Sequence, residues 1–446
     1  MSLIISVSGL RGVVGESLTP DVAARYVAAF TGALPPGLVV VARDGRDTGS
    51  MLASAVRSAV RSTGHDVVYA GIAATPTVGV IASDLKCVGG VQISASHNPA
   101  EYNGLKLFGP EGRVLPAEAG QAVADRFGAG EIAWAPHDKM GVHLQLTDAT
   151  TRHIELVKSL VDVDKIRSKA FRVLLDANHG AGAVVGAPLL EVLGCDVTVL
   201  GDEPDGLFDH PPEPAAANLK SVAQQVADGG FAVGFCQDPD ADRLALIDGG
   251  GRYVGEEYTP ALCVKHVLAQ TPGPVVTNCS TSRMTQDIAE EFGVPFHQAA
   301  VGEANVVDKM VEVGAVLGGE GNGGVIHPRV GLVRDSMVGM ALVLDAMATR
   351  NLPLSALVDE LPRYAIHKAK VAVDRDKIPA ALDALEAHFK DAESSRLDGL
   401  RLDWPEEKKW LLVRGSNTEP IVRVFCEAPT KNQATAAASA ALRVIA

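Results

Sequence analysis

The sequence predicts an α/β protein with three similar mixed α/β domains around a central cleft, followed by a smaller C-terminal α+β domain. Two observations lead to this prediction. A unit of strand, helix, glycine and strand occurs three times before residue 303, and the last part of the chain carries mainly strand-like segments. Such a unit is typical of parallel or mixed sheets covered by helices, and its glycine stands where a left-handed helix C-cap is expected.

The first unit shows how the pattern is recognised. The apolar run LVVVARD (38–44) predicts a strand, residues 50–62 a helix, Gly64 the end of that helix, and DVVYAG (66–71) a second strand. The other two units have the same order: 172–178, the apolar helical stretch GAPLLEVL, Gly194 and 196–201; then 274–280, a helix near 283–292, Gly293 and 295–302. Three repeats of similar length indicate three related domains.

The chain after Tyr364 differs in kind. Here the strand-like segments are KAKVAVD, LRLDW, WLLVRGS and IVRVFCEA, with one predicted helix near 377–390. They indicate an α+β domain with mainly antiparallel strands. The expected boundaries of domains I to IV are 1–150, 151–253, 254–365 and 366–446. Because ligands of open α/β sheets bind beyond the carboxyl ends of the strands, a cleft shared by the domains is the expected site.

Composition and charge exclude several classes of protein. No apolar run is long enough to span a bilayer, and no basic-then-apolar segment follows Met1, so we expect no membrane partner. The six cysteines occur singly, without C-x-x-C pairs, which fits a reduced cytoplasm. Forty basic and 54 acidic residues give a net charge of −14, the wrong sign for nucleic-acid binding. Bound anions must therefore be held by a few placed cations and backbone N–H groups.

The stretch ISASHNP (93–99) places a serine beside a histidine and ahead of an Asn-Pro turn signal. A hydrolase-like pair of Ser96 and His97 is one interpretation. If the strand continues to Ser94, neighbouring side chains point to opposite faces, so we expect His97 not to reach Ser96. The G-x-S-x-G elbow of hydrolases is also missing. On these residues alone, a polar turn remains the simpler alternative.

The stretch QDPDADR (237–243) is the strongest local signal. Its three alternating aspartates stand between the apolar strands FAVGFC and LALID, at the tip of a predicted hairpin. Crowded carboxylates repel one another unless a cation neutralises them, and ligands that offer only oxygen suit Mg²⁺. An EF-hand is excluded, because Arg243 stands where the turn glycine would be. A solvated acidic turn is the alternative. The candidate ligands are Asp238, Asp240 and Asp242.

Two further loops carry polar groups. GGEGNGG (318–324) matches G-x-G-x-x-G, but Pro328 follows too soon for the helix that a dinucleotide site needs. Glu320 and Asn322 could instead grip a ligand rich in hydroxyls, and a plain glycine turn is equally consistent. RGSNTEP (414–420) suits phosphate, and no P-loop motif occurs in the chain. Its candidate donors are Arg414, Ser416, Asn417, Thr418 and the nearby Arg423.

The N-terminal stretch SGLRGVVG (8–15) adds a further cation. We expect Arg11 to lie in a glycine-rich loop, ahead of a helix that Thr19 and Pro20 begin. Taken in order, SASHNP, DPDADR, GEGNGG and RGSNTEP resemble the four loops of the α-D-phosphohexomutase family. The resemblance covers the whole chain, because each loop falls in a different predicted domain.

This resemblance implies a set of roles. Ser96 would be carried as a phosphoserine, and one Mg²⁺ ion would be held by the three aspartates and a phosphate oxygen. Lys106 and Arg11 would handle protons and charge beside the serine, with Arg243, while His97 would shape the loop rather than activate Ser96. Glu320 and Asn322 would hold sugar hydroxyls. The 414–423 loop would hold the other phosphate of the substrate.

The implied reaction interconverts hexose 6-phosphate and hexose 1-phosphate. The phosphoserine would give its phosphoryl group to the sugar phosphate, and the resulting 1,6-bisphosphate would return the other phosphate after turning around. Glucose or hexosamine 1,6-bisphosphate would act as activator, and the partners would be small hexose phosphates. Self-association is left open, and the expected location is the cytoplasm.

The choice of sugar rests on finer likeness. GEGNGG together with RGSNTEP is similar to the archaeal-type branch of phosphoglucosamine and phosphomannomutase/phosphoglucomutase enzymes, and Glu303 stands where some phosphomannomutases have lysine. Glucosamine phosphate is the expected substrate, with phosphomannomutase/phosphoglucomutase activity as the alternative. Two other classes stay open: a metal-dependent phosphosugar phosphatase, which would release free phosphate, and a non-catalytic phosphosugar-binding protein.

Overall fold

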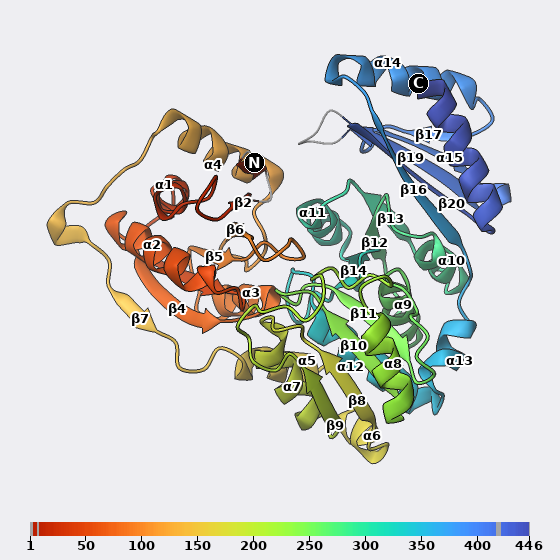
Figure 1. Ribbon diagram of the computed structural model, residues 1–446, viewed down its shortest axis with the longest axis horizontal. Helices are drawn as coiled ribbons and strands as arrows, with labels where there is room; N and C mark the ends of the chain where they lie inside the picture. The colour runs from red at the N-terminus through yellow and green to blue at the C-terminus, as the bar shows by residue number, and fades with distance from the viewer. Residues whose placement is uncertain (1–2, 7–8, 416–420, 446) are drawn as a thin grey trace.

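The structure, a computed structural model, describes residues 3–6, 9–415 and 421–445. Within these residues the chain forms four sheets that follow one another along the sequence (Figure 1). The first three combine parallel and antiparallel strands, and the fourth is antiparallel throughout. The predicted fold class, mixed α/β with a C-terminal α+β part, is thereby confirmed. Among the described residues, no helix is both long enough and apolar enough to cross a membrane.

The N-terminal sheet has seven strands. In spatial order they are β1 (Ile4–Ser6), β2 (Gly9–Val13), β6 (Tyr102–Phe108), β5 (Gly89–Ile93), β3 (Leu38–Arg43), β4 (Asp66–Ile72) and β7 (His143–Gln145). Its helices are α1 (Pro20–Thr31), α2 (Thr48–Ser62), α3 (Thr75–Asp84) and α4 (Ala117–Ala129). The first predicted repeat is present as β3, α2 and β4, and Gly64 has the expected positive φ of 89°.

Strand β3 explains why its sequence is apolar at nearly every position. Val39 and Val41 pack into one core with residues of α1 and α2, whereas Val40 and Ala42 pack into a second core with residues of α3. Alternate side chains of a strand point to opposite faces, so a strand covered on both faces needs a continuous apolar run.

The two middle sheets have four strands each. The second sheet has the order β11 (Leu244–Asp248), β10 (Val233–Gln237), β8 (Arg172–Asp176) and β9 (Asp196–Leu200). The third has the order β13 (Phe296–Ala299), β12 (Val275–Asn278), β14 (Leu317–Glu320) and β15 (Gly324–Ile326). Their helices are α5 (Thr151–Lys158), α6 (Val163–Ser168), α7 (Gly182–Val192), α8 (Lys220–Gly229), α9 (Tyr258–Gln270), α10 (Met284–Glu291), α11 (Glu303–Val313), α12 (Ser336–Arg350) and α13 (Leu354–Asp359).

Helix α12 joins the two middle sheets. It packs against α9 of the third unit and against α5, α6 and α7 of the second, and its residues from Ser336 to Ala348 are all buried. One hydrophobic core therefore runs through both units. Asp335 caps the N-terminus of this helix, because its carboxylate accepts hydrogen bonds from the backbone N–H groups of Met337 and Val338.

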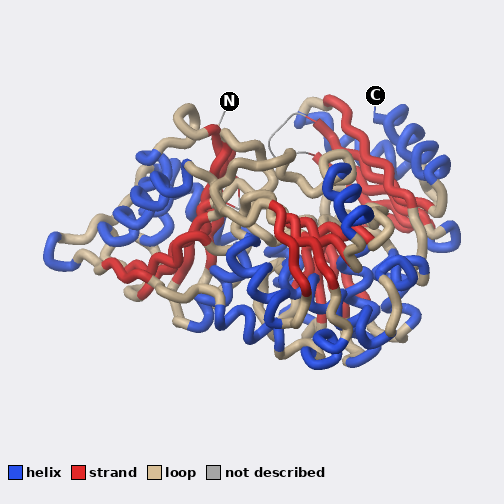
Figure 2. Tube along the Cα trace, turned by 60° about the horizontal axis from the view of Figure 1, so that its bottom comes forward, coloured by secondary structure: helices blue, strands red, loops and turns tan. Residues whose placement is uncertain are grey.

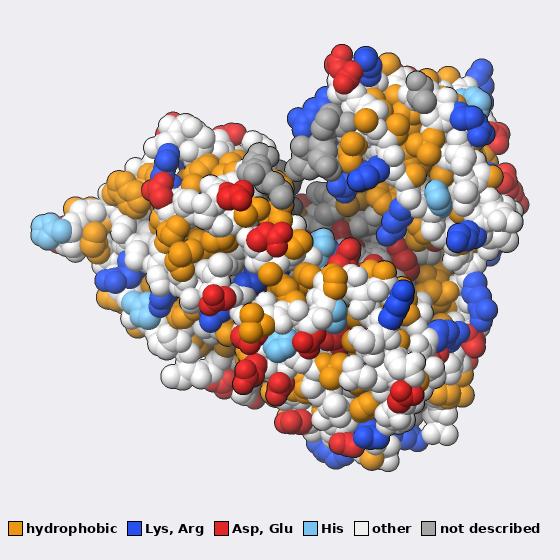
Figure 3. All heavy atoms as spheres, viewed as in Figure 1, with side chains coloured by type: hydrophobic (Ala, Val, Ile, Leu, Met, Phe, Trp, Pro, Cys, Tyr) orange, Lys and Arg blue, Asp and Glu red, His pale blue; other side chains and the backbone are white. Residues whose placement is uncertain are grey.

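The C-terminal unit has its own core. Its sheet has the order β16 (Ala365–Ala372), β20 (Ile421–Ala428), β19 (Lys409–Gly415), β18 (Leu400–Trp404) and β17 (Glu393–Ser395), with helices α14 (Ile378–His388) and α15 (Lys431–Ile445). Figure 2 shows the N-terminal and C-terminal units on either side of the two middle ones. The surface is hollowed between these outer units, and Lys and Arg side chains lie along the C-terminal edge of the hollow (Figure 3).

The four units share one feature that positions the site. In each of them, the loop singled out from the sequence joins a strand to its antiparallel neighbour: β5 to β6, β10 to β11, β14 to β15, and β19 to β20. The third of these confirms that the glycine-rich loop opens a hairpin rather than a helix. The first three loops thus occupy equivalent places in their units, and residues 416–420 of the fourth lie outside the described residues.

Candidate active site

Ser96 lies just past the end of β5 and is almost fully buried, with 2% exposure. Its backbone is left-handed, with a φ of 51°, which is uncommon for a residue other than glycine. The side-chain Oγ donates a hydrogen bond to Asp238 Oδ2 at 2.7 Å, and the backbone N–H donates to Ser94 Oγ at 2.9 Å. The serine of the first unit is therefore held directly against the acidic loop of the second.

The expectation that His97 cannot reach Ser96 is wrong. The Nδ1 atom of His97 lies 3.3 Å from Ser96 Oγ. The alternation argument fails because β5 ends at Ile93 and the chain then makes a left-handed turn at Ser96. Burial, together with the charges of Arg243 and Arg11, lowers the pKa of His97 to about 3. An imidazole with this pKa is a weak base, so contact alone does not make it an activator of the serine.

The three aspartates form the tip between β10 and β11. All are fully buried, and one ligand atom from each lies within 4.8 Å of the others. Ala241, with a φ of 56°, makes the turn between them. The Oδ1 atom of Asp238 accepts hydrogen bonds from the backbone N–H groups of Asp242 and Arg243, both at 3.1 Å, which fixes the tip.

This cluster has the chemistry of a site for a hard cation. The Oδ1 atoms of Asp240 and Asp242 are buried and accept no hydrogen bond, although a buried carboxylate oxygen normally has a partner. Burial and the like charges of its two neighbours raise the pKa of Asp238 well above the ordinary value. An ion such as Mg²⁺, which binds carboxylate oxygens, fits both observations.

Two cations from other units face the aspartates. Lys106 Nζ, from β6, donates to Asp240 Oδ2 at 3.0 Å and to Asp242 Oδ2 at 2.9 Å. Arg334 donates to Asp242 Oδ2 and to Glu320 Oε2, both at 2.6 Å. Burial alone would raise the pKa of Asp242, but Arg334 and Lys106 hold it well below its usual value. The cluster is therefore anchored to units I and III by charge-assisted hydrogen bonds.

Arg11 is placed by a strand and not by the expected glycine-rich loop. It lies in β2, paired with Gly104 of β6, and its Nη1 donates to Asn98 Oδ1 at 3.1 Å. The pairing with β6 depends on residues some 90 positions away, which local sequence does not reveal. Burial lowers the pKa of Arg11, partly offset by the charge of Asp240. The expected helix start is confirmed, because Thr19 Oγ1 accepts from the N–H of Val22 at 3.3 Å.

Arg243 follows the acidic tip. Its Nε is buried without a hydrogen-bond partner and lies 3.9 Å from Asp242 Oδ1. A guanidinium carries five N–H donors, and a buried donor normally has an acceptor. The unpaired Nε–H beside the cluster is therefore available to bind an anion.

Glu320 ends β14 and is almost surrounded by donors. Its Oε1 accepts from Asn278 Nδ2 at 2.7 Å and from the N–H of Gly302 at 3.2 Å, and its Oε2 accepts from Arg334. Asn322 Nδ2 adds a long contact to Oε2 at 3.4 Å. A sugar hydroxyl would compete most easily with this last donor, since it is the weakest.

The C-terminal loop contributes arginines. Arg414 near the end of β19 stands opposite Arg423 of β20, and Arg414 Nε lies 3.2 Å from Asp398 Oδ2. A surface cavity of about 480 Å³ beside them is lined by Arg375 as well as by Arg414 and Asp398. Ser416, Asn417 and Thr418 lie outside the described residues. The described part of the loop is thus cationic, as a phosphate site requires.

Sequence reasoning missed two residues of the site. Arg334 precedes α12, and Thr75 begins α3, where Thr75 Oγ1 donates to Asp240 Oδ2 at 2.5 Å. Arg334 is further held by Glu303, which accepts its backbone N–H at 2.9 Å. Thr75 stands beyond the carboxyl end of β4, so the rule that ligands gather at strand ends was an available signal. For Arg334 the signal was weaker: the charged residues Arg334 and Asp335 stand together just before the apolar helix α12.

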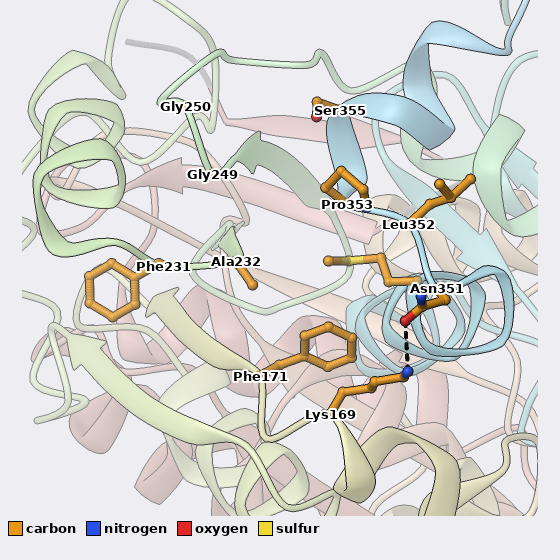
Figure 4. Close-up of a pocket in the computed structure, with 11 residues that line it drawn as sticks. Lys169, Phe171, Phe231, Ala232, Gly249, Gly250, Asn351, Leu352, Pro353 and Ser355 are labelled. Carbon is orange, nitrogen blue, oxygen red and sulfur yellow. Dashed lines mark hydrogen bonds between the residues drawn. The ribbon is translucent and has the colours of Figure 1, made fainter.

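A separate cavity of about 470 Å³ lies at the opposite end of α12 from Arg334. Figure 4 shows its lining, in which Phe171, Leu352 and Pro353 are apolar and Lys169 Nζ donates to Asn351 Oδ1 at 2.7 Å. The lining contains no carboxylate and none of the predicted site residues. This cavity is therefore not part of the candidate active site.

Families described as "Phosphoglucomutase/phosphomannomutase" match the chain in consecutive segments: alpha/beta/alpha domain I at residues 3–132, domain II at 151–251, domain III at 256–364 and the C-terminal domain at 369–443. The four matches cover most of the chain.

Individual relatives agree. A phosphoglucomutase/phosphomannomutase of Thermococcus kodakarensis is 36% identical over 442 residues, covering 97% of this chain and 96% of that protein. A Methanopyrus kandleri protein described as "Probable phosphoglucosamine mutase" is 32% identical, with the same coverage. The crystal structure of a phosphoglucomutase/phosphomannomutase family protein from Burkholderia thailandensis has a TM-score of 0.87 at 27% identity, covering 99% of this chain and 98% of that one. The chain therefore belongs to the phosphoglucomutase/phosphomannomutase family and is an isomerase of the phosphohexomutase type.

Proposed function

We propose that this chain interconverts hexose 6-phosphate and hexose 1-phosphate through a phosphoserine at Ser96, with glucosamine phosphate as its main substrate. The observation that carries the proposal is the contact of Ser96 Oγ with Asp238 Oδ2 at 2.7 Å, inside a cluster that has two buried and unpartnered carboxylate oxygens. A serine used only as a turn residue has no need of such neighbours. A serine that carries a phosphoryl group needs charge neutralisation at this position.

The proposed reaction has two phosphoryl transfers. In the first, the bond between phosphorus and Ser96 Oγ breaks as a hydroxyl oxygen of the sugar loses its proton and bonds to that phosphorus. This yields a 1,6-bisphosphate and free Ser96. In the second, after the sugar has turned around, Ser96 Oγ loses its proton and bonds to the other phosphorus, whose bond to the sugar oxygen breaks. That oxygen takes up a proton and the product leaves. Asp238, Asp240 and Asp242, with an oxygen of the phosphoserine, would hold one Mg²⁺ ion, which supplies charge neutralisation at the transferring group.

The cations of the site have separate tasks in this proposal. Lys106 and Arg11 handle the proton and the charge beside Ser96, and Arg243 offers its unused donor to the transferring phosphoryl group. His97 packs against Ser96 as a neutral imidazole and shapes the loop.

The substrate contacts come from the third and fourth domains. Glu320 and Asn322 hold sugar hydroxyls, and Arg414 and Arg423 hold the phosphate that is not reacting, with help from the 416–418 segment. The division into domains 1–150, 151–253, 254–365 and 366–446 gives each domain one loop of the site. Glucose or hexosamine 1,6-bisphosphate would act as activator, small hexose phosphates would be the ligands, and the enzyme would work in the cytoplasm.

The choice of sugar is supported by relatives described as phosphoglucosamine mutases, such as the one from Methanopyrus kandleri. The second candidate is a phosphomannomutase/phosphoglucomutase, favoured by the Thermococcus kodakarensis relative at 36% identity. A site built around substrate hydroxyl or amino groups can discriminate strongly, because a mismatched polar group is left unpaired.

The test is a direct assay of the purified chain. Glucosamine, glucose and mannose 6-phosphates are each supplied with Mg²⁺ and a trace of bisphosphate, and phosphorus NMR follows the 1-phosphate. We expect turnover of all three, fastest with glucosamine phosphate, and no turnover by Ser96→Ala. Fastest turnover of glucose or mannose phosphate would favour the second candidate. Accumulation of inorganic phosphate would indicate a phosphatase, and binding without turnover would indicate a binding protein.

A further inference from the structure

Arg46 is a buried charge that lies outside the four loops. It follows β3 in the sequence Asp44-Gly45-Arg46 and is 2% exposed. Its Nε donates to Asp44 Oδ2 at 3.2 Å. The other donors all go to backbone carbonyl oxygens: Nη1 to Pro99 at 2.6 Å and Tyr102 at 3.0 Å, Nη2 to Ser96 at 2.7 Å and Asn98 at 2.5 Å. Every N–H of this guanidinium therefore has an acceptor.

All four carbonyl groups belong to residues 96–102, the loop that carries the reactive serine. The planar fork of a guanidinium gathers them from different directions. A lysine has three donors on one nitrogen, so it keeps the charge but cannot span the same four oxygens.

Asp44 holds the backbone N–H of Ser96 through Ser94, in addition to its contact with Arg46. It accepts a hydrogen bond from Ser94 Oγ at 2.6 Å, and Ser94 Oγ in turn accepts the N–H of Ser96 at 2.9 Å. The N–H and the C=O of Ser96 are thus both tied to Asp44, one through Ser94 and the other through Arg46. Such double anchoring explains how a serine can be kept in the left-handed conformation, which persists only where its surroundings enforce it.

The second domain covers this arrangement. The ring centre of Phe208, in the loop after β9, lies 5.0 Å from Cζ of Arg46, in cation–π geometry. The loop fits closely, because a Cβ added at Gly206 would lie 2.6 Å from Cα of Arg46. A Cβ added at Gly45 would lie 2.3 Å from the carbonyl oxygen of His179. The serine loop of domain I is therefore braced by domain II.

We propose that Arg46 is a positioning residue for phosphoryl transfer, which holds the Ser96 loop in its reactive conformation, and that Phe208 completes this brace. The proposal rests on the proposed function. In that function Ser96 gains and loses a bulky dianion in every cycle, so its Oγ must return each time to the same place beside the aspartates. A misplacement of about 1 Å can cost about a hundredfold in rate.

The test compares Arg46→Lys with wild type. Because Arg46 does not touch the sugar, we expect kcat to fall about ten- to a hundredfold, as loss of one or more charged hydrogen bonds implies, with KM for the sugar phosphate unchanged. Amide hydrogen exchange of peptides that cover 94–102 should become faster. Phe208→Leu keeps every hydrogen bond and should lower kcat by about fivefold.

Arg401→Lys is the matched control for folding and exchange. Arg401 is equally buried at 2% exposure, lies over Trp410 at 4.5 Å and pairs with Asp403 at 2.8 Å, and all three residues belong to the C-terminal sheet. We expect it to lower thermal stability without changing exchange at 94–102. Equal acceleration at 94–102 in both variants would mean general loosening and would overturn the proposal.

The remaining outcomes also test whether Arg46 positions the Ser96 loop. Normal kcat with unchanged exchange in a folded Arg46→Lys would overturn the proposal. If Arg46→Lys does not fold, Phe208→Leu alone tests the proposal. Wild-type kcat and wild-type exchange at 94–102 in Phe208→Leu would then overturn it. An inactive wild type would sink the proposed function, while the exchange experiment would still test the brace on Ser96.

Discussion

Ser96 and Asp238, which are 142 positions apart in the sequence, meet through a hydrogen bond of 2.7 Å. This contact joins the first domain to the second at the carboxyl ends of β5 and β10. It brings a hydroxyl group to a cluster of carboxylates whose charge is only partly balanced by Lys106 and Arg334.

Asp240→Asn should weaken Mg²⁺ binding and slow isomerisation by orders of magnitude. The Oδ1 atom of Asp240 is buried with no donor, so it is free to bind a cation, and an amide is a poorer ligand than a carboxylate. Calorimetric titration with Mg²⁺ and kcat measured together check this. Asp228→Asn, at an exposed position on α8, serves as control. A wild-type rate untouched by chelator would contradict the metal assignment.

Arg334→Leu should lower the free energy of unfolding of the middle domains by about 3–5 kcal/mol, because it removes a charged hydrogen-bond donor from two buried carboxylates. Those carboxylates are Asp242 and Glu320, each 2.6 Å from the guanidinium. Arg350→Leu, at the last residue of α12, breaks an exposed pair with Glu360 and should cost less than about 1 kcal/mol. Urea unfolding of the two variants compares them, and equal losses would show that the buried pairs are not special.

Arg414→Ala should lower kcat/KM about ten- to a hundredfold in both directions of the reaction, since one charged hydrogen bond is worth about 1.5–3 kcal/mol. The same arginine would hold the distal phosphate in both orientations of the bisphosphate. More labelled 1,6-bisphosphate should also escape during turnover, because the intermediate is held less firmly while it turns. Normal kcat/KM with an unchanged escape fraction would remove the 414–423 loop from the active site.

Glu257 gives a dependence of stability on pH. Burial raises its pKa to about 8, although its carboxylate accepts the N–H of Ser282 at 2.9 Å. A carboxyl whose pKa is raised on folding stabilises the protein fully below its ordinary pKa, and this contribution is lost as pH rises towards 8. Glu257→Gln should therefore lose less stability than wild type between pH 6 and pH 8.5. Thermal unfolding at both values measures this, and parallel losses would contradict the assignment.

The fold could be predicted because its signals are local. Runs such as that of β3, which is buried on both faces, followed by a helix and a glycine, depend only on neighbours in the sequence. The left-handed turn at Ser96 could not be predicted, because it is enforced by Asp44 and Arg46, about 50 positions earlier. The strand that holds Arg11 likewise depends on pairing with β6.

The candidate site likewise has a part that could be predicted from local sequence and a part that could not. The acidic tip, with three aspartates in seven residues, was visible in the sequence. Arg334 and Thr75 carried only general signals, because the contacts with Asp242 and Asp240 that give them a role form only when the chain folds. Contacts between domains therefore carry the part of the site that sequence patterns leave out.

The central claim is that Ser96 carries the phosphoryl group to the sugar. The most direct measurement loads the enzyme with radiolabelled phosphate from labelled 1,6-bisphosphate, removes the small molecules, and adds unlabelled glucosamine 6-phosphate. The account predicts label on Ser96 at the start, its transfer to glucosamine 1,6-bisphosphate within one turnover, and no labelling of Ser96→Ala. Label that maps to another residue, or that leaves only as inorganic phosphate, would contradict it.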